Sequence, residues 1–223
     1  MVPVISAALA KELQDRFLER QTQIISLTRA LVEAESPSGD QDGSRAVVDL
    51  LAKAAETAQC VNSIDRVDVP EFGQHLVIRA YQDKAASGNI LLVGHTDTVH
   101  SRGSVAERPC RSEGNRIYGP GIFDMKANCA LAIALLHACD DFSIVPNCGV
   151  ILALTCDEEV GSSSGWPVLR SIAEKESVKS ALILEPPAPG GRAKTSRKGT
   201  GIFKMQVEGR AARPVGPPGR RLP

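Results

Sequence analysis

The sequence is poor in histidine, in paired cysteines and in long apolar runs. Only four histidines are present, and none follows His137. The six cysteines form no CxxC pair and lie mostly in apolar runs, so we expect reduced core thiols and not a disulfide framework or a zinc knuckle. No run approaches the ~20 apolar residues of a membrane span, and the N-terminal stretch lacks the basic region of a secretory signal. We therefore expect a cytoplasmic protein without a membrane partner.

The chain also lacks an excess of charge of either sign. Its 26 lysines and arginines balance 26 aspartates and glutamates, and basic residues gather only at 192–198 and near the C-terminal end. This balance gives no reason to expect a nucleic-acid partner. The length of 223 residues and the 43% hydrophobic content are ordinary for a globular enzyme.

What the sequence does contain is an alternation of strand-like and helical segments. Helical periodicity predicts a long helix at 5–35, and a second helix to about residue 58 follows the loop Ser36–Gly39. Further helices are predicted at 126–138 and 163–175, and strands at 63–69, 75–81, 89–93, 150–155 and 180–184. This order predicts an α/β fold with a mixed, mostly parallel sheet flanked by helices.

A histidine and several acidic residues stand where these segments end. The apolar run at 91–100, LLVGHTDTVH, ends in His95 and Asp97, whose i and i+2 spacing puts both side chains on one face of a strand. Asp124 lies between a glycine-rich turn and a helical segment, and Glu185 closes the run at 180–184. The strand predicted at 150–155 is followed by Asp157, Glu158 and Glu159.

Each of these features has a simpler interpretation when it is taken alone. His95 and Asp97 could be surface residues, Asp124 a helix N-cap, and Glu185 a strand end broken by proline. In an open α/β sheet, however, ligands bind outside the carboxyl ends of the strands. Four such ends in succession therefore favour a site.

The order and spacing of these residues resemble those of the zinc-dependent aminoacylase and carboxypeptidase family, which includes glutamate carboxypeptidase, acetylornithine deacetylase and succinyl-diaminopimelate desuccinylase. The matching motifs are GHTDTV at 94–99, YGPGIFDMK at 118–126, TCDEEVGS at 155–162 and ILEP at 183–186. The resemblance spans roughly residues 20–210. It implies the catalytic domain of a two-zinc exopeptidase, incomplete and followed by only the first strand of a lid or dimerisation domain.

The resemblance also implies the metal ligands. His95 and Glu185 would bind one zinc ion, Glu159 would bind a second, and Asp124 would bridge the two, with cobalt as an alternative metal. Histidine nitrogen and carboxylate oxygen suit zinc, and a metal pair lowers the pKa of a bridging water while it polarises a carbonyl.

Two further residues would serve the reaction directly. By resemblance, Asp97 would orient His95 from behind the metal. Glu158 would be the general base that takes a proton from the water and passes it to the leaving amine. The family pattern also implies a cis peptide between Asp124 and Met125.

The sequence departs from the family pattern beyond Ala212, where it reads RPVGPPGRRLP. This composition cannot form a packed element, so a frameshift or truncation near residue 212 is our hypothesis. We expect a catalytic domain at 1–195, a hinge and first lid strand at 196–210, and an aberrant, disordered tail at 211–223. Homodimerisation through the lid would then be lost.

A second departure, at Ala127–Cys129, replaces the glycines that often follow the bridging aspartate with residues that are still small. A third is that no histidine follows His137. By resemblance, one later histidine would complete the second zinc site and another, in the lid, would stabilise the oxyanion, and both are absent. We interpret His75, His100 and His137 as core, strand or surface residues and not as replacements. The chain itself is therefore expected to be impaired.

Three functions remain open from the sequence. The first is a metal-dependent hydrolase that cleaves the amide bond of a small peptide or an N-acyl amino acid. The second is a non-catalytic remnant or interaction module, in which an exposed lid strand and the basic tail bind a partner. The third is a two-zinc aminopeptidase, which uses a similar ligand set.

Overall fold

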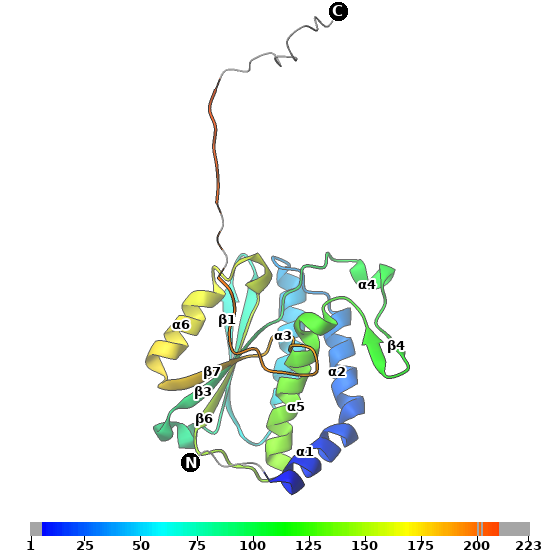
Figure 1. Ribbon diagram of the computed structural model, residues 1–223, viewed down its shortest axis with the longest axis vertical. Coiled ribbons are helices and arrows are strands. Elements are labelled where there is room, and N and C mark those ends of the chain that lie inside the picture. The colour runs from blue at the N-terminus through cyan, green and yellow to red at the C-terminus, as the bar shows by residue number, and fades with distance from the viewer. Residues whose placement is uncertain (1–5, 200, 202, 210–223) are drawn as a thin grey trace, which may run out of the picture. The chain divides into compact units, whose positions relative to one another are not determined.

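A computed structural model describes residues 6–199, 201 and 203–209 and divides the chain into two units, Met1–Pro186 and Pro187–Pro223. The first unit is built on a five-stranded sheet with the order β1-β2-β6-β3-β7 (Figure 1). The strands are β1 (Val61–Val69), β2 (Gly73–Ala80), β3 (Asn89–His95), β6 (Gly149–Thr155) and β7 (Val178–Ile183).

The pairing of these strands confirms the predicted mixed, mostly parallel sheet. β3 pairs in parallel with both β6 and β7, whereas β2 pairs antiparallel with both β6 and β1. β2 alone therefore runs against the other four strands. Parallel strands need crossover connections, and helices supply them here.

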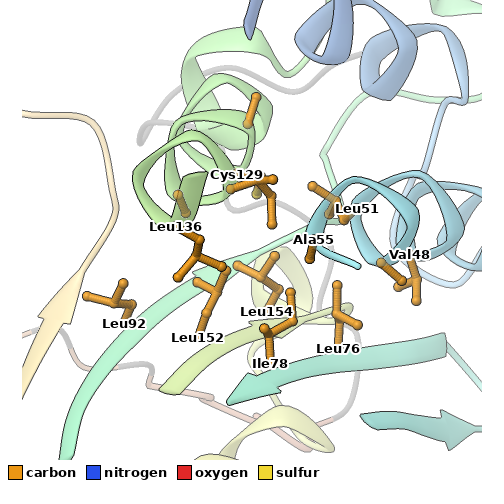
Figure 2. Packing of buried hydrophobic residues seen from close by; sticks show 14 of the residues in the cluster. Val48, Leu51, Ala55, Leu76, Ile78, Leu92, Cys129, Leu136, Leu152 and Leu154 are labelled. Atoms are coloured by element: carbon orange, nitrogen blue, oxygen red, sulfur yellow. The ribbon is translucent and has the colours of Figure 1, made fainter. Parts of the chain in front are cut away.

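Helices cover both faces of the sheet, as the predicted α/β fold requires (Figure 1). They are α1 (Ala7–Glu19), α2 (Gln21–Glu33), α3 (Gln41–Ala55), α5 (Ala127–Asp141) and α6 (Gly165–Lys175). Along β6, Leu152 and Leu154 face the main core under α3 and α5, which Figure 2 shows, while Ile151 and Ala153 face Ile172 of α6. This alternation is the two-residue period of a strand that is buried on both faces.

The predicted long helix at 5–35 is wrong, because the segment forms two helices. Arg20 separates α1 from α2 with φ −84° and ψ 0°, which is outside regular α-helix geometry. Its guanidinium binds Asp141 at the end of α5, with Nε 2.8 Å from Oδ2. Arg20 and Asp141 lie 121 positions apart in the chain, and neither proline nor glycine marks the break between the helices. The sequence around Arg20 therefore carries no local signal of the break.

Short elements between the main ones are not predicted from the sequence. They are η1 (Gln82–Ser87), α4 (Ser104–Glu107), β4 (Arg111–Glu113), β5 (Arg116–Tyr118), η2 (Ile122–Lys126) and η3 (Glu158–Val160). Strands β4 and β5 form a separate two-stranded sheet. Elements of three to six residues are too short to show a hydrophobic period.

Among the described residues, one helical segment, Ile122–Asp141, is long and apolar enough to cross a membrane by length and composition. Half of its most apolar window is buried inside the protein. Its α5 part supplies core residues such as Ile133 and Leu136. The apolar composition is therefore explained by packing on the sheet.

In the second unit, the described residues contain an isolated bridge between Ala188 and Arg192. The first lid strand expected within 196–210 is not formed in the part of that segment that the structure describes, 196–199, 201 and 203–209. Within the described residues, no strand pairs with this segment. The predicted tail at 211–223 lies outside the described residues, and the predicted domain limits remain predictions.

Candidate metal centre

Three neighbouring strands end at one edge of the sheet and bring the predicted site residues together. β3 ends at His95, β6 is followed by Asp157–Glu159, and β7 is followed by Glu185. Since β3 lies between β6 and β7 and runs parallel to both, their carboxyl ends meet. The predicted site residues thus gather at the carboxyl ends of these strands.

Asp124 reaches this edge from the turn before α5. The peptide bond between Asp124 and Met125 is cis, as the resemblance implies. Met125 is fully buried, and its sulfur lies 3.3 Å from the backbone nitrogen of His95. A Cβ at Gly94 would lie only 2.5 Å from Met125 Cε, so the missing side chain at Gly94 lets Met125 pack under β3 and hold Asp124 beside His95.

His95, Asp124 and Glu185 form a cluster whose ligand atoms all lie within 4.8 Å of one another. His95 Nε2 lies 3.1 Å from Asp124 Oδ1 and 3.5 Å from Glu185 Oε1. The histidine is buried, while both carboxylates are accessible from outside. One imidazole nitrogen and two carboxylate oxygens are a donor set that zinc accepts.

The electrostatics of this cluster favour a cation. Burial alone would lower the pKa of His95, but Asp97, Glu158 and Glu185 raise it to about 9. Burial raises the pKa of Glu185 above its ordinary value, and the charges of Asp124 and Glu158 add to this against the opposing charge of His95. Several carboxylates therefore surround a single imidazole, and a bound metal ion would supply the positive charge that balances them.

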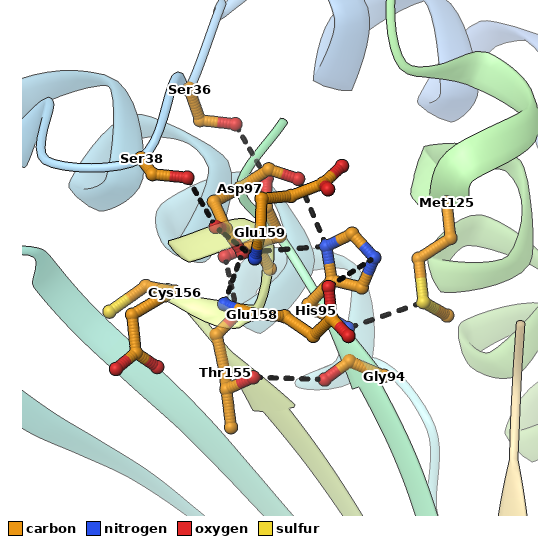
Figure 3. Close-up of polar contacts among 12 residues, drawn as sticks. Ser36, Ser38, Gly94, His95, Asp97, Met125, Thr155, Cys156, Glu158 and Glu159 are labelled. Carbon is orange, nitrogen blue, oxygen red and sulfur yellow. Dashed lines mark hydrogen bonds and ion pairs between the residues drawn. The ribbon is translucent and has the colours of Figure 1, made fainter. Parts of the chain in front are cut away.

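Asp97 lies beside His95, on the side of Nδ1 (Figure 3). It is 2% exposed, and His95 Nδ1 lies 3.0 Å from its backbone oxygen and 3.4 Å from Oδ1. Burial alone would raise the pKa of Asp97, but hydrogen bonds from His95, Ser38 and the backbone hold it below its ordinary value. The residue is therefore a buried anion that can fix the direction of the imidazole ring.

The two glutamates after β6 occupy different places. Glu158 Oε2 lies 4.0 Å from His95 Nε2, and its side chain is 47% exposed. Glu159 is not one of the three clustered residues, although burial and the charges of Asp124 and Asp97 raise its pKa against the charge of His95. Glu158 can thus reach both the cluster and solvent.

Three contacts at this edge are made by residues that the sequence analysis does not select. Ser38 Oγ donates to Asp97 Oδ2 at 2.6 Å. Asn128 Nδ2 donates to Leu184 O at 2.6 Å, which ties the start of α5 to the chain that carries Glu185. The fully buried Lys126 donates to Leu31 O at 2.6 Å.

The other three histidines lie away from this cluster. His75 is buried on β2, where Nδ1 accepts from the backbone N–H of Cys156. His137 lies on α5 with Nε2 3.0 Å from Ala54 O, and His100 lies beside Arg108. Their interpretation as strand, core or surface residues agrees with these positions.

Comparison with known proteins decides the family. The model of peptidase family M20/M25/M40 matches residues 91–218, more than half of the chain. The chain belongs to this family. The matched range includes all four predicted metal ligands and runs past Ala212, the point at which the motif resemblance alone predicts an end.

Curated members of the family resemble the chain over most of its length. It is 27% identical to carboxypeptidase G2 of Pseudomonas sp. (strain RS-16) over 191 residues, 85% of this chain and 44% of that protein. It is 30% identical to succinyl-diaminopimelate desuccinylase of Acidovorax ebreus (strain TPSY) over 205 residues, 82% of this chain and 50% of that protein. The chain thus spans about half the length of these relatives.

Solved structures show the same fold. The M20 family metallo-carboxypeptidase Sso-CP2 from Sulfolobus solfataricus has a TM-score of 0.63 at 18% identity, covering 78% of this chain and 39% of that one. Human carnosine dipeptidase 1 has a TM-score of 0.61 at 16% identity, covering 77% and 40%. These likenesses confirm the predicted α/β catalytic fold.

Proposed function

We propose that this chain carries the metal-binding and proton-transferring groups of a hydrolase that cleaves the amide bond of a peptide or an N-acyl amino acid. The convergence of His95, Asp124 and Glu185 within 4.8 Å carries this proposal. Relatives named as a carboxypeptidase and a desuccinylase support it. Zinc at this site would polarise the amide carbonyl and lower the pKa of a water molecule.

The proposed ligands are those that the resemblance to the family implies, and three of them, His95, Asp124 and Glu185, lie close together. His95 and Glu185 would hold the first zinc ion, and Asp124, 3.1 Å from His95 Nε2, would be shared with a second ion. Glu159 is the proposed carboxylate ligand of that second ion. The raised pKa of Glu159 reflects its burial near Asp124. Cobalt is the alternative metal, because it accepts the same nitrogen and oxygen donors.

Glu158 is the proposed general base. Its carboxylate lies 4.0 Å from His95 Nε2 and is half exposed, so it can face both the cluster and a substrate that enters from solvent. It would accept a proton from water and return it to the amine that leaves. Asp97 keeps His95 in the orientation that exposes Nε2 to the cluster.

Location and partners are proposals as well. A cytoplasmic location is supported by six free thiols, four of which are buried. A small peptide or an N-acyl amino acid is the proposed substrate, and homodimerisation is a proposal for the complete family fold. The acyl group or side chain that is cleaved would be selected by the complete family fold, since this chain spans about half the length of its relatives.

The test is the release of free amino acid from a panel of dipeptides and N-acyl amino acids, with zinc and with a chelator. We expect chelation to abolish turnover. Glu158→Gln should lower turnover by about 10²–10⁴-fold, the usual contribution of a general base, while zinc content stays unchanged. Glu71→Gln, at an exposed position in the turn between β1 and β2, is the control. Equal turnover with and without metal would contradict the proposal.

A further inference from the structure

The loop between α2 and α3 is fastened to the strand end that carries His95. The backbone N–H of Thr98 donates to Ser36 O at 3.0 Å, and that of Ser38 donates to Thr98 O at 3.3 Å. Ser36 Oγ also donates to Thr96 O at 2.6 Å. Residues 36–38 therefore extend along 96–98 like a short parallel strand, around a bridge between Pro37 and Thr98.

Ser38 makes a second contact from this loop that goes to a side chain and not to the backbone. Its hydroxyl donates to Asp97 Oδ2 at 2.6 Å, as Figure 3 shows. A hydrogen bond to an ionised acceptor is stronger than one between neutral groups. Since Asp97 is 2% exposed, bulk water cannot readily replace the hydroxyl.

The carboxylate of Asp97 joins three segments of the site. Oδ1 accepts from the backbone N–H of Glu158 and Oδ2 from that of Glu159, both at 3.1 Å. His95 Nδ1 lies 3.4 Å from the same Oδ1. Rotation of this carboxylate would therefore disturb the imidazole and the chain that carries both glutamates at once.

We propose that Ser38 is a positioning residue of the metal centre. Its hydroxyl holds Asp97 in the one orientation that aligns His95 and anchors the backbone of Glu158 and Glu159. This inference rests on the proposed metal-dependent hydrolysis, and it adds a residue from the N-terminal part of the chain to the machinery at the strand ends.

The first test measures amide hydrogen exchange in the metal-free chain. Ser38→Ala should accelerate exchange at the Glu158 and Glu159 amides, because their acceptor is no longer held, and Ser38→Thr, which keeps the hydroxyl, should restore protection. Two variants serve as controls. Ser36→Ala removes only the bond to Thr96 O, and Ser63→Ala removes a 3.4 Å bond to Asp65 on exposed β1.

The second test measures zinc affinity by competition with a chelator. Loss of a group that orients a metal ligand typically weakens affinity about 10–100-fold, and we expect this for Ser38→Ala but not for Ser38→Thr or Ser63→Ala. Unchanged exchange at both amides in Ser38→Ala would overturn the inference. A wild-type chain that binds no zinc would instead overturn the proposed function, and the exchange data would still decide the role of Ser38.

Discussion

His75 is a titratable residue enclosed in the core beside the site. It is 1% exposed, its Nδ1 accepts from the backbone N–H of Cys156, and its Nε2 has no hydrogen-bond partner among the described residues. Burial lowers the pKa of His75 below its ordinary value of 6.5, against the opposing charges of Asp157 and Asp97. Burial therefore favours the neutral form of this imidazole in the folded protein.

This burial makes stability depend on pH. As pH falls through about 6.5, the unfolded chain binds a proton that folded His75 resists, so the free energy of unfolding decreases. The loss continues down to the folded-state pKa and amounts to about 1.4 kcal/mol for each unit between the two pKa values. Above the unfolded-state pKa, His75 is neutral in both states, and this loss of stability is absent.

His75→Gln should therefore lose less stability than the wild type between about pH 7.5 and about pH 5, although it is less stable at the higher pH. Urea unfolding at the two pH values measures this difference. Parallel losses in the two proteins would show that His75 does not contribute to acid sensitivity.

At the same scale, the sequence reveals some site residues and hides others for a physical reason. His95, Asp124 and Glu185 follow strand ends or a glycine-rich turn, and those local signals can be read. Ser38 meets its partner across 59 positions and Asn128 across 56. Such contacts exist only after the chain has folded, and each of these residues looks like an ordinary loop or helix residue in sequence.

Among the elements, α6 is joined to the site through Asp157. This residue is fully buried, and Oδ2 accepts from the backbone N–H of Ser164 at 2.6 Å and from its hydroxyl at 2.8 Å. Oδ1 accepts from the backbone N–H of Gly165 at 3.1 Å, where α6 begins. Asp157 thus caps the helix while it precedes Glu158 in the chain.

Asp157→Ala should destabilise the protein by about 2–3 kcal/mol, because it leaves buried donors without an acceptor. Ser6→Ala is a matched cap control: Ser6 caps α1 through Leu9 N at an exposed position, and its loss should cost about 0.5–1 kcal/mol. Free energies of unfolding from urea titration compare the two. Equal small losses would mean that Asp157 does not hold α6.

The predicted elements agree best with the observed ones where packing produces a clear hydrophobic period in the sequence. Strand β6 is predicted at 150–155 and found at Gly149–Thr155, and α5 is predicted at 126–138 and found at Ala127–Asp141. The break at Arg20 is not predictable from the sequence, since an ion pair and not a helix-breaking residue accompanies it. The sequence also does not reveal which strand runs antiparallel to the others, because the two-residue period of a strand carries no information on its direction.

For the whole molecule, the structure shows a family catalytic fold in the described part of Met1–Pro186 and no more than an isolated bridge in the described part of Pro187–Pro223. The site residues all lie in the first unit. The proposed metal binding thus involves residues of the first unit alone, whatever share of the relatives' length this chain spans.

A metal that binds only the folded state must raise stability by mass action. At a free zinc concentration of about 100 times Kd, the gain is about 2.7 kcal/mol. The wild-type melting temperature should therefore rise with added zinc and fall back with a chelator. His95→Ala should show no rise, whereas His100→Ala, beside Arg108 and outside the cluster, should behave as the wild type.

The central claim is tested most directly by the zinc content of the purified chain after equilibrium dialysis against micromolar zinc. We predict about one tightly bound ion per wild-type chain, the same content in His100→Ala, and loss of the ion in His95→Ala with its circular dichroism unchanged. A zinc-free wild type, or a His95→Ala variant that retains its zinc, would contradict the assignment of this edge of the sheet as a metal centre.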